Sequence, residues 1–170
     1  MLPTKASRSD GSLASRPRAK TPRNQRVGPR RSGDPTAPGI LSQGQLTVRG
    51  TWSVNLDTGA EINNAAVADF FWVQRTAVKR FLVPRNGATF LVVGERLLES
   101  VAYADLQRLT VSSQPIDGSE GRENQLRPGT VIAYRTQRGH LGKLRIIQYG
   151  DNLVIRWTTY ALTTSEPTRP

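Results

Sequence analysis

Residue types that could do acid–base chemistry are few in this sequence. His140 is the only histidine, and cysteine is absent. A general base needs an orienting partner and a reacting group within hydrogen-bond reach, and no G-x-S-x-G or similar nucleophile motif supports such a group here. We therefore interpret His140 as an exposed turn residue, and we predict no catalytic residue and no enzymatic activity. A hydrolase that pairs His140 with a loop carboxylate is the least favoured alternative.

Carboxylates cluster in two turn regions, at Asp57 and Glu61 and at Asp117, Glu120 and Glu123. Calcium prefers about six to eight oxygen ligands, and neither cluster matches the EF-hand pattern D-x-[DN]-x-[DN]-G. Zinc is disfavoured because a single histidine and no cysteine leave only carboxylates as ligands. Glycine-rich phosphate loops are also missing. The sequence therefore predicts no metal and no cofactor.

Positive charge is concentrated near the N-terminus. Residues 1–38 contain nine of the 24 basic residues and only two acidic ones, and the whole chain has a formal net charge of +11. The segment has no aromatic residue and is rich in Pro, Ser and Gly. It cannot bury enough surface to offset the entropy of ordering its backbone. We predict a disordered basic arm over residues 1–42, a β-rich domain over 43–162 and a flexible tail over 163–170.

A flexible basic arm attracts phosphate without sequence specificity. Nucleic-acid binding through residues 1–38 is therefore our alternative function, and a solvating tail or a targeting segment is the competing interpretation of the arm. Basic residues of the C-terminal strands could assist, and Tyr134, Tyr149 and Tyr160 could stack on bases. The candidate nucleic-acid contacts are Arg16, Arg18, Lys20, Arg23, Arg26, Arg30, Arg31, Lys143, Arg145 and Arg156.

Membrane and export signals are weak in this sequence. No apolar run approaches the roughly 20 residues that a membrane-spanning helix needs, and the N-terminus lacks the apolar core of a secretory signal peptide. We therefore expect no transmembrane segment and no secretory signal. The compartment and the partner remain open, and an oligomer is also compatible with the sequence.

The elements that would position these residues are mostly strands. Alternation predicts a strand over 45–56, and runs of apolar residues predict strands over 69–76, apolar on both faces, and over 79–83. Asn86-Gly87 predicts a hairpin into 88–93, and a short helix is expected over 103–109. Three runs separated by short turns predict an antiparallel meander over Thr130–Thr136, Gly142–Gln148 and Asn152–Tyr160.

Strands without intervening helices cannot be parallel neighbours. The predicted fold class is therefore all-β, an antiparallel sandwich or small barrel with one short helix. Loops on a rigid sheet carry most recognition. We therefore predict a non-catalytic binding or interaction module whose contact surface combines the 112–128 loop with the 137–142 and 149–152 turns. The candidate ligand-binding residues are Asp117, Glu120, Arg138, His140, Tyr149 and Asp151.

Short motifs are spread over residues 50–160: G-T-W-S-V at 50–54, D-T-G at 57–59, A-D-F-F-W at 68–72, L-V-P-R-N-G-A at 82–88, A-D-L-Q at 104–107, N-Q-L at 124–126, P-G-T-V at 128–131, R-T at 135–136 and W-T-T-Y at 157–160. Together they resemble a bacterial β-rich domain that occurs singly and in repeats and has no established activity. The resemblance implies a compact module and transfers no site residue. The chain departs from that pattern at 139–143 and 149–152, where the related domain has G-N-Y-A-K and Y-G-Y-N.

A second likeness is architectural. A disordered Arg-rich arm before a β-sandwich looks like the coat protein of a small RNA virus, in which the arm neutralises packaged RNA. The likeness rests only on the order of arm and sandwich, and no segment of this sequence matches a coat protein.

Overall fold

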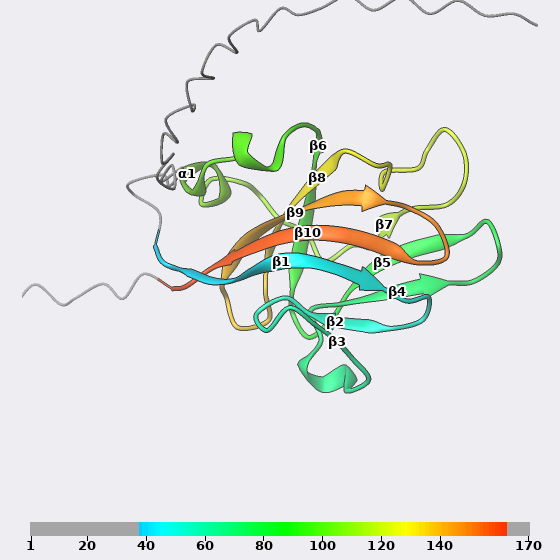
Figure 1. Ribbon diagram of the computed structural model, residues 1–170, viewed down its shortest axis with the longest axis horizontal. Coiled ribbons are helices and arrows are strands. Elements are labelled where there is room, and N and C mark those ends of the chain that lie inside the picture. Colours follow the sequence, from blue (N-terminus) through cyan, green and yellow to red (C-terminus); the bar gives the residue numbers. More distant parts are fainter. Residues whose placement is uncertain (1–37, 163–170) are drawn as a thin grey trace, which may run out of the picture. The chain divides into compact units, whose positions relative to one another are not determined.

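The computed structural model describes residues 38–162, which form two five-stranded antiparallel sheets (Figure 1). The all-β fold class with one short helix is confirmed, and the predicted arm and tail lie outside the described residues apart from residues 38–42. The first sheet has the order β1-β10-β9-β8-β6, with β1 (Ile40–Val48), β6 (Thr89–Glu95), β8 (Thr130–Arg135), β9 (Leu141–Gln148) and β10 (Leu153–Tyr160). The second has the order β3-β2-β4-β5-β7, with β2 (Ser53–Asn55), β3 (Ala60–Ile62), β4 (Phe70–Gln74), β5 (Arg80–Pro84) and β7 (Ile116–Asp117).

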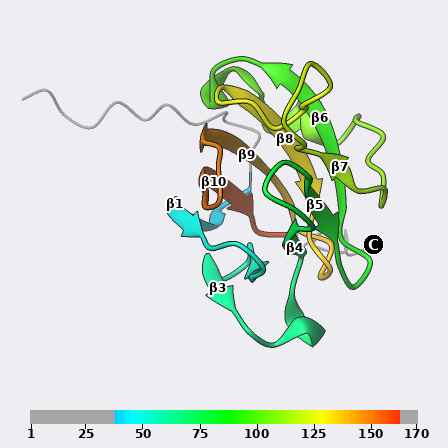
Figure 2. The same ribbon diagram turned by 90° about the vertical axis from the view of Figure 1, so that its right-hand side faces the viewer.

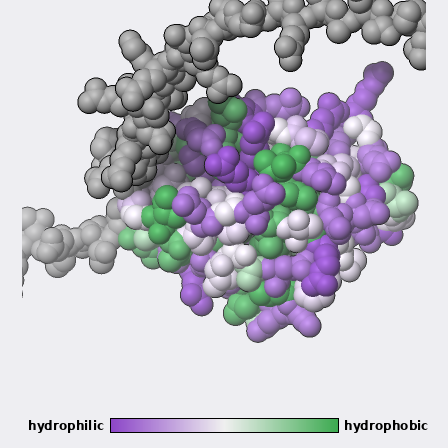
Figure 3. All heavy atoms as spheres, in the orientation of Figure 1, coloured by the Kyte–Doolittle hydropathy of each residue, from purple (hydrophilic) through white to green (hydrophobic). Residues whose placement is uncertain are grey.

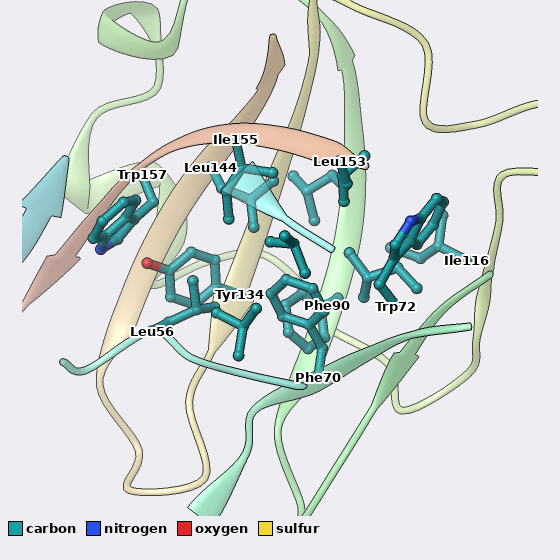
Figure 4. Close-up of a cluster of buried hydrophobic side chains, with 14 of the residues drawn as sticks. Leu56, Phe70, Trp72, Phe90, Ile116, Tyr134, Leu144, Leu153, Ile155 and Trp157 are labelled. Carbon is teal, nitrogen blue, oxygen red and sulfur yellow. The ribbon is translucent and has the colours of Figure 1, made fainter. Parts of the chain in front are cut away.

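The main core lies between the two sheets, where alternate residues of facing strands meet (Figure 4). The first sheet contributes residues such as Tyr134, Leu144 and Ile155, and the second contributes Phe70 and Trp72. Burying one face of each strand against another sheet is the usual way for an antiparallel sandwich to shield its apolar side chains. The sequence meets this requirement because most strands alternate between apolar and polar residues.

A second, smaller core covers part of the outer face of the first sheet. It is formed by the segment with the 3₁₀ turn η2 (Leu98–Ser100) and the helix α1 (Tyr103–Leu106). Leu98 and Leu106 pack there with Val131, and the Tyr103 and Tyr160 rings meet edge to face at 5.0 Å. A further 3₁₀ turn, η1 (Ala65–Val67), precedes β4. No helix within residues 38–162 is long and apolar enough to cross a membrane.

The predicted first strand is in fact two strands in different sheets. β1 begins at Ile40 and ends at Val48, and β2 begins only at Ser53. Between them Thr51 adopts a left-handed conformation with φ of 63°, which breaks the extended chain so that it passes from the first sheet to the second. The apolar alternation continues through the break, because both strands bury one face in the same core. Strand β1 therefore already includes residues 40–42, which the sequence assigned to the arm.

Two further predictions about the second sheet need correction. The apolar run at 70–73 is not covered on both sides: Phe70 and Trp72 are buried, whereas Phe71 and Val73 are only half-buried. Asn86 and Gly87 have positive φ values of 51° and 82°, as a tight turn requires. However, this turn leads from β5 into β6 of the other sheet, and β5 instead pairs with β4. The C-terminal meander β8-β9-β10 is confirmed.

Candidate binding surface

The outer face of the second sheet carries an unusual set of side chains. β4 and β5 pair in register, so that Phe71 lies opposite Val83 and Val73 lies opposite Phe81. Directly opposite residues of an antiparallel pair project from the same face. Figure 2 shows β4 and β5 side by side, next to β7. None of these four half-buried residues belongs to either buried cluster of the described chain.

The same pentapeptide pattern occupies both strands. Phe71–Arg75 reads F-W-V-Q-R and Phe81–Arg85 reads F-L-V-P-R, so that each has the form F-x-V-x-R. Trp72 pairs with Leu82 at the centre of the two strands. A local two-fold axis normal to the sheet at this pair relates the two patterns. We call the outward residues Phe71, Val73, Arg75, Phe81, Val83 and Arg85 the Phe–Arg face.

Each arginine of this face lies over the phenylalanine of the neighbouring strand. The guanidinium carbon of Arg75 is 5.3 Å from the centroid of the Phe81 ring, and that of Arg85 is 5.4 Å from the Phe71 ring. Cations within about 6 Å of a ring centroid are attracted by the ring quadrupole. The two pairs therefore repeat the same contact in both halves of the hairpin.

A cleft of about 420 Å³ adjoins the Phe–Arg face at the β2–β3 side. Trp52 and Phe71 line it together with Arg85. Arg49 lies over the Trp52 ring at 3.7 Å, and its Nε donates to Glu61 Oε2 at 2.7 Å. The cleft thus combines two aromatic rings, each with a guanidinium group beside it. Ligand sites commonly combine aromatic walls with a few polar groups in this way.

The cations on and beside the Phe–Arg face differ in whether they form an ion pair. Arg49 has an ion pair with Glu61, but Arg75, Lys79 and Arg85 form no ion pair with any carboxylate of residues 38–162. All three are exposed. Arg75 N–H donates to the Lys79 carbonyl at 2.9 Å, which places these two cations opposite each other at the end of the hairpin. Positive charge therefore lies at both ends of the Phe–Arg face.

One carboxylate lies at the border of this face. Asp117, a predicted ligand-binding residue, pairs with Phe81 across β7 and β5. Hydrogen bonds from the Ser119 side chain and backbone lower the pKa of Asp117 from its ordinary value of 3.8. Asp117 is therefore charged at neutral pH and limits the basic surface on this side.

The aromatic and basic residues of this surface are not among the residues predicted to bind a ligand. The sequence does carry a signal for them, because F-x-V-x-R occurs twice with a spacing of ten residues. The prediction that Phe70–Val73 is buried on both faces hides this signal. With period-two alternation, Phe71, Val73 and Arg75 would have been assigned to one outward face.

Three of the predicted ligand-binding residues surround a different group, the buried Arg80. Its guanidinium donates to Glu120 Oε1 at 2.9 Å and to Asp151 Oδ1 at 2.7 Å. The Tyr149 hydroxyl lies 3.3 Å from Arg80 Nη1 and donates to the Gly118 carbonyl. These bonds connect β5, the 112–128 loop and the β9–β10 turn. The 112–128 loop and the 149–152 turn are thus brought together, but around a protein side chain.

The other two predicted ligand-binding residues lie at the opposite end of β9. Arg138 and His140 precede Leu141, whereas Tyr149 follows Gln148, and seven residue steps along a strand span about 23 Å. The predicted contact surface therefore divides into two separate regions. Arg138 is exposed in its turn.

His140 is not the exposed turn residue that the sequence predicted. Only 15% of its side chain is accessible, and its Nδ1 lies 3.0 Å from Oδ1 of the buried Asp57. Thr136 Oγ1 also lies on the Nδ1 side, at 3.5 Å. In a Ser-His-Asp triad the carboxylate and the nucleophile occupy opposite ring nitrogens. Here both neighbours share one nitrogen, so the arrangement resembles a structural contact more than a triad.

Asp69 lies close to this pair and connects two turns. Its carboxylate oxygens accept the Leu56 N–H at 2.6 Å and the Gln137 N–H at 2.8 Å. Asp69 is fully buried, and desolvation raises its pKa above the ordinary value of 3.8 although the two backbone hydrogen bonds oppose that shift. Among the described residues no group of three His, Asp or Glu side chains has the geometry to hold a metal ion.

The predicted nucleic-acid contacts are only partly accessible in the structure. Those of the arm lie outside residues 38–162. Lys143 is buried, because the α1 segment covers it and its Nζ donates to the Val101 carbonyl at 2.6 Å. Arg145 and Arg156 do lie opposite each other on β9 and β10, and Arg156 lies 3.4 Å from Glu99.

The tyrosines proposed for base stacking are also placed by the structure. Tyr134 is buried in the main core and Tyr160 in the smaller one, whereas Tyr149 meets the Trp72 ring edge to face. Tyr134 and Tyr160 therefore cannot stack on bases.

Comparison of this chain with family models, with curated proteins and with solved structures finds no match in any of the three.

Proposed function

We propose that residues 38–162 form a non-catalytic binding module whose contact surface is the Phe–Arg face and the adjoining cleft. The observation that carries this proposal is the repeated Phe–Arg pair on a sheet face whose apolar residues are half-buried and belong to neither buried cluster. Aromatic rings outside the core expose apolar surface to water, which is unfavourable, and they add nothing to the packing of the core. Their presence on two neighbouring strands favours a role in binding.

A large apolar surface for docking another protein is a less favoured explanation of the Phe–Arg face. On the side visible in Figure 3, apolar side chains form small separate groups among hydrophilic ones. Interfaces between permanently associated proteins usually present broader apolar areas. The mixture of rings and guanidinium groups on the Phe–Arg face is better suited to a ligand that has both planar and anionic parts.

Hydrolysis remains the weaker alternative because of the geometry at His140. Asp57 orients the imidazole, which a general base requires. However, the hydroxyl that lies beside the ring among residues 38–162, Thr136 Oγ1, is on the same nitrogen as the carboxylate. The described residues offer no nucleophile on the Nε2 side.

The test compares three full-length proteins against immobilised single-stranded homopolymers, neutral glycans and short peptides. The variant Phe71→Leu/Phe81→Leu keeps apolar volume but removes both ring faces. Arg138→Ala is the matched control, because it removes an exposed residue of the contact surface predicted from the sequence. Any probe that binds the wild type is expected to be lost by the double variant and retained by the control. Binding that survives in the double variant, or that depends on Arg138, would contradict the proposal.

A further inference from the structure

We infer that the ligand of the Phe–Arg face is a single strand of nucleic acid, a conclusion that rests on the proposed binding function. Such a strand offers planar bases for the rings and phosphates for the guanidinium groups. Single-strand-binding proteins combine these same two elements, stacking rings and a basic surface. Both occur together here on one hairpin.

The spacing of the two rings favours an unstacked strand. Phe71 and Phe81 are diagonal neighbours, because Phe71 is opposite Val83 and Val83 lies two residues from Phe81. Diagonal positions on an antiparallel pair are about 7–8 Å apart. That is roughly twice the 3.4 Å rise between stacked bases in a duplex. Two bases bound to the two rings would therefore be pulled apart from each other, which a duplex resists and a single strand allows.

The charges at the ends of the face supply the phosphate contacts. Arg85 lies at one end, and Arg75 and Lys79 lie at the other, none of them paired with a described carboxylate. A backbone that crosses the hairpin would meet positive charge before and after the two rings. Phosphate pairing releases counterions, so these contacts should appear as salt dependence.

Other occupants match only part of this surface. A neutral glycan could stack on the rings but would bring no negative charge to the three cations, of which only Lys79 has a described carboxylate, Asp117, acting on it. An acidic peptide could pair with the cations but would not require two ring faces. A second copy of the chain would bring Arg75, Lys79 and Arg85 against the same cations, which repel one another.

The experiment measures the anisotropy of a labelled single-stranded homopolymer of about 16 nucleotides at several salt concentrations, with the full chain throughout. Phe71→Leu/Phe81→Leu is expected to weaken binding by about 30-fold or more, because the loss of each base-stacking ring weakens binding about 5- to 150-fold, with little change in salt dependence. Arg75→Gln and Arg85→Gln are each expected to reduce the slope of log affinity against log salt by about 0.7. Arg138→Ala is the control and should change neither quantity.

A second protein separates the face from the basic N-terminal segment. In it glutamine replaces seven residues: Arg16, Arg18, Lys20, Arg23, Arg26, Arg30 and Arg31. If the face binds the strand, this protein still loses affinity when both phenylalanines are replaced. If the N-terminal segment alone binds, the ring substitutions have no effect in either background, and the inference is overturned.

Further outcomes distinguish the inference from the proposed function. Equal affinity for the homopolymer and its duplex, or no binding at low salt, overturns the inference. If a glycan or peptide then binds and is lost in Phe71→Leu/Phe81→Leu, the proposed binding module survives with a different ligand. If no probe depends on the two rings, both proposals fail. Circular dichroism and the urea midpoint confirm that each variant is folded.

Discussion

Replacing Gly142 by alanine is expected to destabilise the domain severely, because a buried ring occupies the space of the new methyl group. Gly142 lies opposite Tyr134 in the β8–β9 pair, and a Cβ at this position would be closer than 3.0 Å to the phenol carbon and oxygen of that ring. The ring cannot easily move. Its hydroxyl is 2.7 Å from Thr159 Oγ1, and the Phe90 ring lies 5.9 Å away on the interior side.

Overpacking of a core usually lowers the free energy of unfolding by about 1–3 kcal/mol, occasionally more. Because the Tyr134 ring cannot move aside, we expect Gly142→Ala to lower it by about 3 kcal/mol. In urea, with a slope of about 2 kcal/mol per M, the midpoint should fall by about 1.5 M. Gly150→Ala is the matched control. The nearest heavy atom to its Cβ would be 3.8 Å away, so its free energy of unfolding should change by less than about 0.5 kcal/mol. A loss below about 1 kcal/mol for Gly142→Ala would refute the idea of a rigid ring over this glycine.

Three further substitutions test other parts of the fold by urea unfolding. Arg80→Met should change the free energy of unfolding by less than about 1 kcal/mol, because Glu120 and Asp151 are exposed and a buried arginine is often replaceable by an apolar residue; a loss above about 3 kcal/mol would contradict this. Burial raises the pKa of Asp69 above 3.8, so its contribution to stability is full below pH 3.8 and is lost as the pH rises through the folded-state pKa. The non-titrating Asp69→Asn should therefore show a flatter pH profile, and an equally steep one would argue against this origin. Asn86 has φ of 51° and its side chain donates to two carbonyls before β4, so Asn86→Ala should cost about 1 kcal/mol more than Asn86→Gly, and equal costs would exclude backbone strain.

Much of the fold follows from local patterns in the sequence. The meander was predictable because Thr130–Tyr160 alternates strand-forming residues with short polar turns. The division of 45–56 into two strands was not, because both halves point apolar residues into the same core. The break depends on the left-handed backbone of Thr51, a conformation that threonine rarely adopts. Which sheet a strand joins is likewise set by contacts between distant segments.

The candidate sites were harder to predict than the fold. Loop carboxylates suggested a ligand, but the partner of Glu120 and Asp151 is Arg80, which is distant in sequence. The local sequence predicts an exposed turn for His140, because no residue nearby in the sequence can pair with it. Asp57 reaches it from a turn 83 residues away. The Phe–Arg face depends on the register between β4 and β5, which places alternate residues of two separate runs on one surface.

The two-fold arrangement of the hairpin has a consequence for the direction of a bound strand. A nucleic-acid strand has chemically different 5′ and 3′ ends, but the two rings and two arginines of the Phe–Arg face present the same groups in reversed order. These four side chains therefore offer equivalent contacts to a single strand in either direction. A preference for one direction would have to come from the groups that the two-fold axis does not repeat, which are Lys79 and Asp117 at one end and the cleft beside Phe71 at the other.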